Sequence, residues 1–224
     1  MVQMHYYGHS CFQLLHNQVG LLFDPFFTNN PLNTTDPKKI SCNFILVSHA
    51  HGDHLGDTFD IAQRTKAVVI STAEIANLCA QQGCSSHAMH LGGKHKFDFG
   101  SVRITPAFHG SGIPGGHACG FIVDFFGVVV YFAGDTSLFG DMELLGRLEK
   151  IDYALLPIGD NYTMGPQDAA EAVGMLKPRI VIPMHYNTWP LIEQSPEDFK
   201  TAVEKRFQIP VQIVPPGTKL TLTK

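Results

Sequence analysis

The chain has few cysteines, no long apolar run and no cluster of basic residues. Its five cysteines include no Cys-x-x-Cys pair, and the opening residues MVQMHYYGHS lack the regions of a signal peptide, so we expect reduced thiols in a cytoplasmic protein. The longest apolar stretch, Cys119–Gly134, is interrupted by Asp124 and is too short to span a membrane. No Lys/Arg run exceeds Lys38-Lys39 and the net charge is −4, so we expect neither nucleic-acid nor membrane partners.

The composition indicates one compact domain that contains both strands and helices. The 224 residues are 44% hydrophobic and 16% charged, which suits a single domain over residues 1–224 with a substantial core. Apolar runs predict strands at Val2–Tyr7, Cys11–His16, Gly20–Phe23, Ile45–Ser48, Ala67–Ile70, Phe97–Phe99, Val102–Phe108, Ala118–Phe125, Val128–Phe132, Tyr153–Ile158, Ile180–Met184, Val211–Val214 and Lys219–Leu222. Helices are predicted at Ala73–Gln82, Asp141–Lys150, Pro166–Leu176 and from Ser195 to Phe207. This order predicts an α/β (α+β) fold of two packed sheets with helices outside.

The most informative segment is HAHGDH, which places His49, His51, Asp53 and His54 within six positions. It follows the predicted strand Ile45–Ser48, on the kind of loop that carries function on a rigid scaffold. Imidazole and carboxylate ligands together suit zinc, iron, manganese or nickel. Because the side chains can point to two sides of a turning loop, one loop could serve two adjacent ions. The alternative is an accidental histidine-rich surface loop.

Further residues of ligand type follow other predicted strands. His109 follows Val102–Phe108, Asp135 follows the run that ends in Gly134, and His185 follows Ile180–Met184. Each alone has an ordinary explanation, since a histidine after a strand is often structural and Gly-Asp often forms a turn. Three such residues at strand ends favour a shared metal site.

These motifs identify the family that the chain resembles. HAHGDH with His109, Asp135 and His185 resembles the ligand order of the metallo-β-lactamase superfamily across the chain. The phrases GHSCF, PIGDNYTMGPQDA and PMHYNTWP resemble its small branch of metal-dependent hydrolases, which is similar to the ascorbate-6-phosphate lactonase group. The resemblance implies a four-layer αβ/βα sandwich with the metals at one edge. It also implies that the first metal is held by His49, His51 and His109, the second by Asp53, His54 and His185, and that Asp135 bridges them.

Four other residues are weaker site candidates. His9, in GHSCF, is expected at the site edge with a catalytic role, although a structural histidine is the rival interpretation. The glycine-rich loop 110–116 beside His109 could close over substrate with His117 as a donor, or could be a surface connection. Asp160 and Asn161 could hydrogen-bond substrate, or could simply form a turn.

The predicted function is metal-dependent hydrolysis of a small-molecule substrate. Two divalent ions, zinc in the first place with manganese, iron or nickel as alternatives, would lower the pKa of a bridging water. The resulting hydroxide would attack an ester or lactone of a small polar acid, with Asp53 orienting the nucleophile. Phosphodiester hydrolysis and an iron-dependent oxidoreductase are the alternatives, and a non-catalytic binding module is disfavoured because all seven ligands are present. Homo-oligomerisation stays open.

Overall fold

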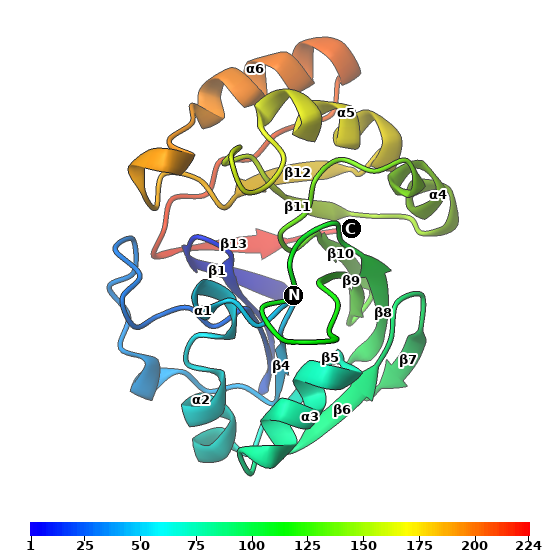
Figure 1. The fold of residues 1–224 in the computed structure, drawn as a ribbon. Coiled ribbons are helices and arrows are strands. Elements are labelled where there is room, and N and C mark those ends of the chain that lie inside the picture. Colours follow the sequence, from blue (N-terminus) through cyan, green and yellow to red (C-terminus); the bar gives the residue numbers. More distant parts are fainter.

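Two mixed sheets form the centre of the protein, and the computed structural model describes them over residues 1–224 (Figure 1). The first has seven strands in the order β13-β1-β2-β3-β4-β5-β6, and the second has six in the order β12-β11-β10-β9-β8-β7. The strands are β1 (Val2–Gly8), β2 (Cys11–His16), β3 (Val19–Phe23), β4 (Phe44–Leu46), β5 (Val68–Thr72), β6 (Ser86–Met89), β7 (Lys94–Phe97), β8 (Gly100–Pro106), β9 (Cys119–Phe125), β10 (Val128–Phe132), β11 (Tyr153–Pro157), β12 (Ile180–Met184) and β13 (Thr218–Leu222).

Helices cover the outer faces of both sheets. They are α1 (Gly52–Leu55), α2 (Thr58–Thr65), α3 (Ala73–Gln81), α4 (Asp141–Leu148), α5 (Pro166–Leu176) and α6 (Pro196–Phe207), with short 3₁₀ turns η1 (Pro37–Lys39) and η2 (Pro190–Ile192). In Figure 1, α2 and α3 lie on one side of the molecule and α4, α5 and α6 on the opposite side. The predicted αβ/βα sandwich is therefore confirmed. None of these helices is long and apolar enough to cross a membrane.

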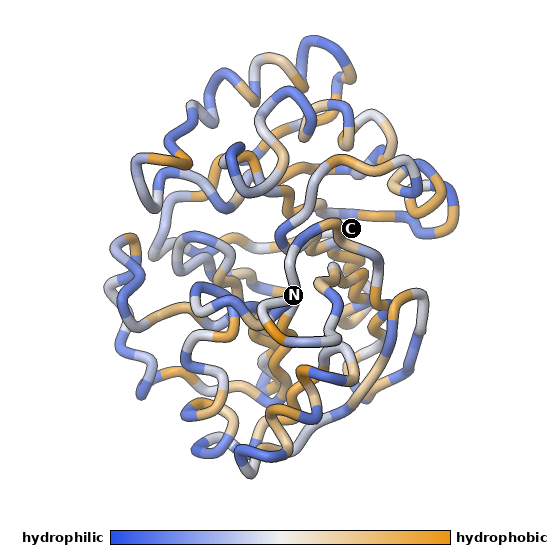
Figure 2. The backbone as a smooth tube through the Cα atoms, viewed as in Figure 1, coloured by the Kyte–Doolittle hydropathy of each residue, from blue (hydrophilic) through white to orange (hydrophobic).

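The apolar core lies between the layers. A cluster of 45 buried residues joins the facing sides of both sheets to α4, α5 and α6, and a second cluster of 15 residues lies between the first sheet and α2 and α3. Figure 2 shows the same division, with hydrophobic strands inside and hydrophilic segments on the outer helices. At about 25 cal/mol per Å² of buried apolar surface, these clusters are the main source of stability.

The structure corrects several predicted elements. Val211–Val214 is not a strand: only Val211 forms a bridge, with Val181, and Pro210, Pro215 and Pro216 cannot donate to a ladder. The expected strand Phe97–Phe99 is instead β7, which ends at Phe97. Helices α1 and α2 and strand β6 were absent from the prediction.

Other predicted elements are found with small shifts at their ends. The turn Phe126-Gly127 joins β9 and β10, with φ of 50° and 85°, as a type I′ turn requires.

Candidate metal centre

The strand directions bring the ligand-type residues to one edge of each sheet. In the first sheet, β1 and β3 are both antiparallel to β2, and β3 is parallel to β4, so β1, β3 and β4 end at the same edge. In the second sheet, β8 and β10 are both antiparallel to β9, and β10, β11 and β12 are parallel. The residues that follow these strands therefore meet across the gap between the two sheet edges.

His49, His51 and His109 form one group of potential ligands. One nitrogen of each lies within 4.8 Å of the others. His49 follows β4, His51 is the residue before α1, and His109 follows β8. The Nε2 atom of His49 lies 2.9 Å from Nδ1 of His51. His49 is fully buried, whereas the side chain of His109 is 15% exposed and reaches the solvent side.

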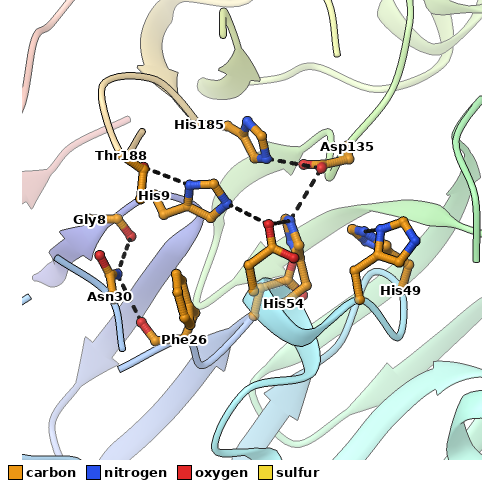
Figure 3. Close-up of polar contacts among 12 residues, drawn as sticks. Gly8, His9, Phe26, Asn30, His49, His54, Asp135, His185 and Thr188 are labelled. Carbon is orange, nitrogen blue, oxygen red and sulfur yellow. Dashed lines mark hydrogen bonds and ion pairs between the residues drawn. The ribbon is translucent and has the colours of Figure 1, made fainter. Parts of the chain in front are cut away.

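His9, Asp53, His54 and His185 form a second group within the same 4.8 Å limit. Figure 3 labels three of them, His9, His54 and His185. Asp53 and His54 lie in α1, and His185 follows β12 with a positive φ of 55°. The Nε2 atom of His9 lies 3.1 Å from Oδ2 of Asp53, and its Nδ1 lies 2.8 Å from Oγ1 of Thr188. Because the carboxylate can only accept, Nε2 of His9 donates to Asp53 and the Thr188 hydroxyl donates to Nδ1.

Asp135 lies between the two groups. Its Oδ2 atom is 3.0 Å from Nε2 of His185, 3.3 Å from Nε2 of His54 and 3.6 Å from Nε2 of His109. Its Oδ1 atom is buried without a hydrogen-bond partner. Gly134 turns the chain into this position with φ of 62°, where a Cβ would lie 2.6 Å from the carbonyl oxygen of Cys119.

Asp24, which the sequence analysis did not single out, orients one histidine of each group. Its fully buried carboxylate accepts from the Ser48 amide at 2.7 Å, from the Ser48 hydroxyl at 2.6 Å and from His54 Nδ1 at 2.7 Å. Because the Ser48 hydroxyl donates its single hydrogen to Asp24, Ser48 Oγ accepts a hydrogen bond from Nδ1 of His49 at 2.9 Å. The sequence did contain a signal for Asp24, because it follows the predicted strand Gly20–Phe23 just as Asp135 follows the predicted strand Val128–Phe132.

This network directs one ring nitrogen of each histidine at the centre. In both His49 and His54 the Nδ1 atom donates its hydrogen outward, so Nε2 is the nitrogen that can bind a cation. The Nε2 atom of His54 is buried without a hydrogen-bond partner and faces Oδ2 of Asp135 at 3.3 Å. Burial lowers the pKa of His54, but Asp135 and Asp24 outweigh it and raise that pKa well above the usual value. The space between Nε2 of His54 and Asp135 therefore favours a cation, which is a proton without metal and a metal ion when one displaces it. The residues therefore fit a metal centre.

Burial and neighbouring charges set the protonation of the cluster. Burial lowers the pKa of His49 well below its usual value, with a further contribution from His54. Burial and the neighbouring His185 lower the pKa of His9 to about 3, so this ring is neutral. Burial raises the pKa of Asp135, but His185 and His54 outweigh it, and the net pKa lies well below the usual range. An ionised carboxylate among imidazoles that give up any bound proton to a metal forms a suitable donor set for a divalent ion.

A cavity of about 230 Å³ opens over the cluster. Its lining consists of His51, Asp53, His109, Asp135, His185, Tyr162 and Trp189. The sequence analysis missed Tyr162 and Trp189, although both lie in family-like phrases. The other expected substrate contacts do not line it: His117 is exposed beside His90, with ring centroids 5.6 Å apart. Asp160 and Asn161 form an exposed turn with φ of 61° and 48°.

The two-sheet αβ/βα sandwich with this ligand cluster is a metal-binding fold, and comparison with known proteins identifies it as that of a metal-dependent hydrolase and gives the family. The Beta-lactamase superfamily domain matches residues 20–186, and the chain belongs to this superfamily. A UPF0173 metal-dependent hydrolase of Pelotomaculum thermopropionicum is 50% identical over 223 residues, covering 96% of this chain and 97% of the relative. A second, of Natranaerobius thermophilus, is 48% identical over 221 residues, covering 99% and 100%. The structure of Igni18, a metallo hydrolase of Ignicoccus hospitalis, matches with a TM-score of 0.93 at 37% identity, covering 100% of this chain and 99% of that one.

Proposed function

We propose that the protein hydrolyses a small ester or lactone with two divalent metal ions bound in the centre. The observation that carries this is the position of Asp135, whose Oδ2 atom lies within 3.6 Å of nitrogens from both ligand groups. A carboxylate shared in this way suits two neighbouring cations, because its charge offsets their repulsion. His49, His51 and His109 would hold the first ion, and Asp53, His54 and His185 the second.

Zinc is the first choice for these ligands, since imidazole nitrogen and carboxylate oxygen are among its common protein ligands, and manganese, iron and nickel accept the same set. When bound, such ions supply Lewis acidity, which makes hydroxide available at neutral pH and stabilises the oxyanion that forms at the scissile carbonyl.

Asp53 is the group best placed to orient the nucleophile and transfer its proton. Its side chain is 27% exposed and lines the cavity. Burial raises its pKa, but the hydrogen bond from His9 and the nearby His54 outweigh this and hold the pKa below the usual range. As an ionised carboxylate it accepts a hydrogen bond from the attacking group and passes the proton to the leaving oxygen.

His9 is a positioning residue in this proposal. It is fully buried and does not line the cavity, and its hydrogen bonds join Thr188 to Asp53. Neutral at physiological pH, it fixes the carboxylate of Asp53 without adding charge.

The test compares metal-free protein with protein reloaded with Zn²⁺, Mn²⁺, Fe²⁺ or Ni²⁺. Each form is assayed on γ-butyrolactone, a simple thioester and bis(p-nitrophenyl) phosphate. We expect lactone hydrolysis to be lost when the metal is removed and restored when it is added back. The activity should be lost in His51→Ala but retained in His95→Ala, which changes an exposed histidine outside the cluster. Faster turnover of the phosphodiester, or turnover only with oxygen and iron, would reject the ester assignment.

A further inference from the structure

The cavity over the metal centre has aromatic walls. Besides the cluster residues, only Tyr162 and Trp189 line it. Tyr162 is 52% exposed and Trp189 is 37% exposed, so both leave apolar ring surface uncovered at the entrance. Large exposed aromatic surface beside a reactive centre is a feature of ligand sites, because covering it removes apolar area from water.

Trp189 packs against His9, which belongs to the second ligand group, and against Phe26. Its ring lies 4.9 Å from that of His9 and 6.2 Å from that of Phe26, between centroids. The preceding residue, Thr188, is buried and hydrogen-bonded to His9. The indole is therefore supported on its protein side, and an aryl group that packs against its exposed part would gain contact at a small cost in conformational entropy.

The lining offers no cationic side chain besides its histidines, so the metal ions, at the scissile bond, would be its main positive charge. None of the chain's 16 lysines and arginines lines the cavity, whereas the carboxylates of Asp53 and Asp135 do. A carboxylate or phosphate at the end formed by Tyr162 and Trp189, away from the ions, would lose hydration with no lysine or arginine beside it. A neutral substituent has no such cost.

We propose that the substrate carries a neutral aryl group beside its ester or lactone bond, and that Trp189 and Tyr162 select it. This inference rests on the proposed function, and it replaces the small polar acid expected from the sequence with a substrate that carries an apolar ring. The cavity volume of about 230 Å³ suits a single ring, since it lies below the roughly 300–1,000 Å³ of sites for drug-sized ligands.

The first test measures hydrolysis of three matched lactones by the metal-loaded enzyme. They are γ-butyrolactone, γ-phenyl-γ-butyrolactone and its 4-carboxyphenyl derivative, which share the scissile bond. We expect kcat/KM for the phenyl compound to exceed that for each of the other two at least tenfold. The phenyl preference should fall about tenfold in Trp189→Ala, partly recover in Trp189→Phe, and persist in Phe126→Ala, which removes an aromatic ring 40% exposed in the β9–β10 turn.

Tyr162 is tested by a pair of variants that separate its ring from its hydroxyl. Tyr162→Phe should keep the phenyl preference and Tyr162→Ala should reduce it, because the proposal assigns selection to the ring. An unchanged preference in both Trp189→Ala and Tyr162→Ala, or a preference for the carboxylated lactone in the wild type, would overturn the proposal.

A binding measurement separates this proposal from the proposed function. Trp189 is the only tryptophan in the chain, so intrinsic indole fluorescence reports directly on the cavity. The probes are 5-phenyl-2-pyrrolidinone, its 4-carboxyphenyl derivative and 2-pyrrolidinone, lactams that resist hydrolysis. We expect the phenyl lactam to bind at least tenfold more tightly than the others. Selective binding without hydrolysis of any lactone would reject the proposed function and retain the aryl site, whereas equal binding of all three lactams would reject the aryl site.

Discussion

Asp24 and His54 form a 2.7 Å hydrogen bond between two fully buried side chains, 30 residues apart in the sequence. The same carboxylate oxygen accepts from Ser48, whose hydroxyl in turn accepts from His49. One buried carboxylate thus sets the tautomer of a histidine in each ligand group. Burial raises the pKa of Asp24, and the hydrogen bonds from His54 and Ser48 act against that rise.

Asp24→Asn should weaken metal binding in both ligand groups. The Asn amide nitrogen donates hydrogen bonds, as do the Ser48 hydroxyl and Nδ1 of His54 that face it. His54 therefore loses its acceptor, and His49 loses the oriented Ser48 hydroxyl, so neither ring is held with Nε2 toward the metal. We expect a 10–100-fold loss of metal affinity, the range typical of such outer-shell partners. Titration against a chromophoric chelator measures it, with Asp98→Asn, an exposed aspartate outside the site, as the control. If the variant bound metal as tightly as the wild type, Asp24 would not be needed to orient His49 and His54.

Metal saturation should give two ions per chain. The two ligand groups each offer at least three donor atoms, and Asp135 adjoins both. Elemental analysis after loading and desalting checks the number, and the quenching of Trp189 fluorescence by Co²⁺ follows binding near the cavity. A limit of one ion per chain at saturation would reject the two-ion proposal.

The sequence predicted the two sheets because most of their strands are continuous apolar runs between turn signals. It missed β6, since Ser86–Met89 is a partly exposed edge strand without alternation, and α1, since four residues inside the ligand motif give no helical periodicity. Val211–Val214 is apolar enough for a strand, but the prolines that flank it leave one bridge. Strand content follows from local pattern, whereas edge pairing depends on tertiary contacts.

Within the site, residues at strand ends could be predicted because the fold gathers such ends at one edge. The contacts of Asp24 could not, since its role depends on a pairing with Ser48 and His54 that no local spacing encodes. Tyr162 and Trp189 were missed for a similar reason, because a cavity wall is built from separate loops and carries no ligand signature. Donor types are readable from sequence, but outer contacts are not.

The five thiols should resist modification in the native protein. All five cysteines are free and buried, and burial raises the pKa of Cys42 to about 11 and of Cys79 to about 12. Thiolate is the reactive form, so near neutral pH a thiol reagent can react only after the structure around the cysteine opens locally. Ellman's reagent should titrate fewer than one thiol per native chain and five after denaturation in guanidinium. Rapid reaction of even one native thiol would contradict the buried arrangement.

Asp135→Asn should remove the second ion while leaving the fold intact. The variant keeps the shape of the side chain but loses the negative charge that lies beside His185, His54 and His109. Without that charge, two cations at the roughly 3.5–4 Å separation of two-metal sites repel each other more strongly. We therefore expect about one ion per chain and a fall in lactone hydrolysis by orders of magnitude.

The fold should persist because Asp135 lies beyond the end of β10 and outside the two apolar clusters. Metal stoichiometry, hydrolysis and thermal melting are compared for wild type and variant, each in metal-free and metal-saturated buffer. Two retained ions with near-normal turnover would show that Asp135 does not bridge. A metal-free variant that no longer folds would instead assign Asp135 to the structure of the turn, because the loss of its ion pairs with His185 and His54 alone lowers the melting temperature without preventing folding.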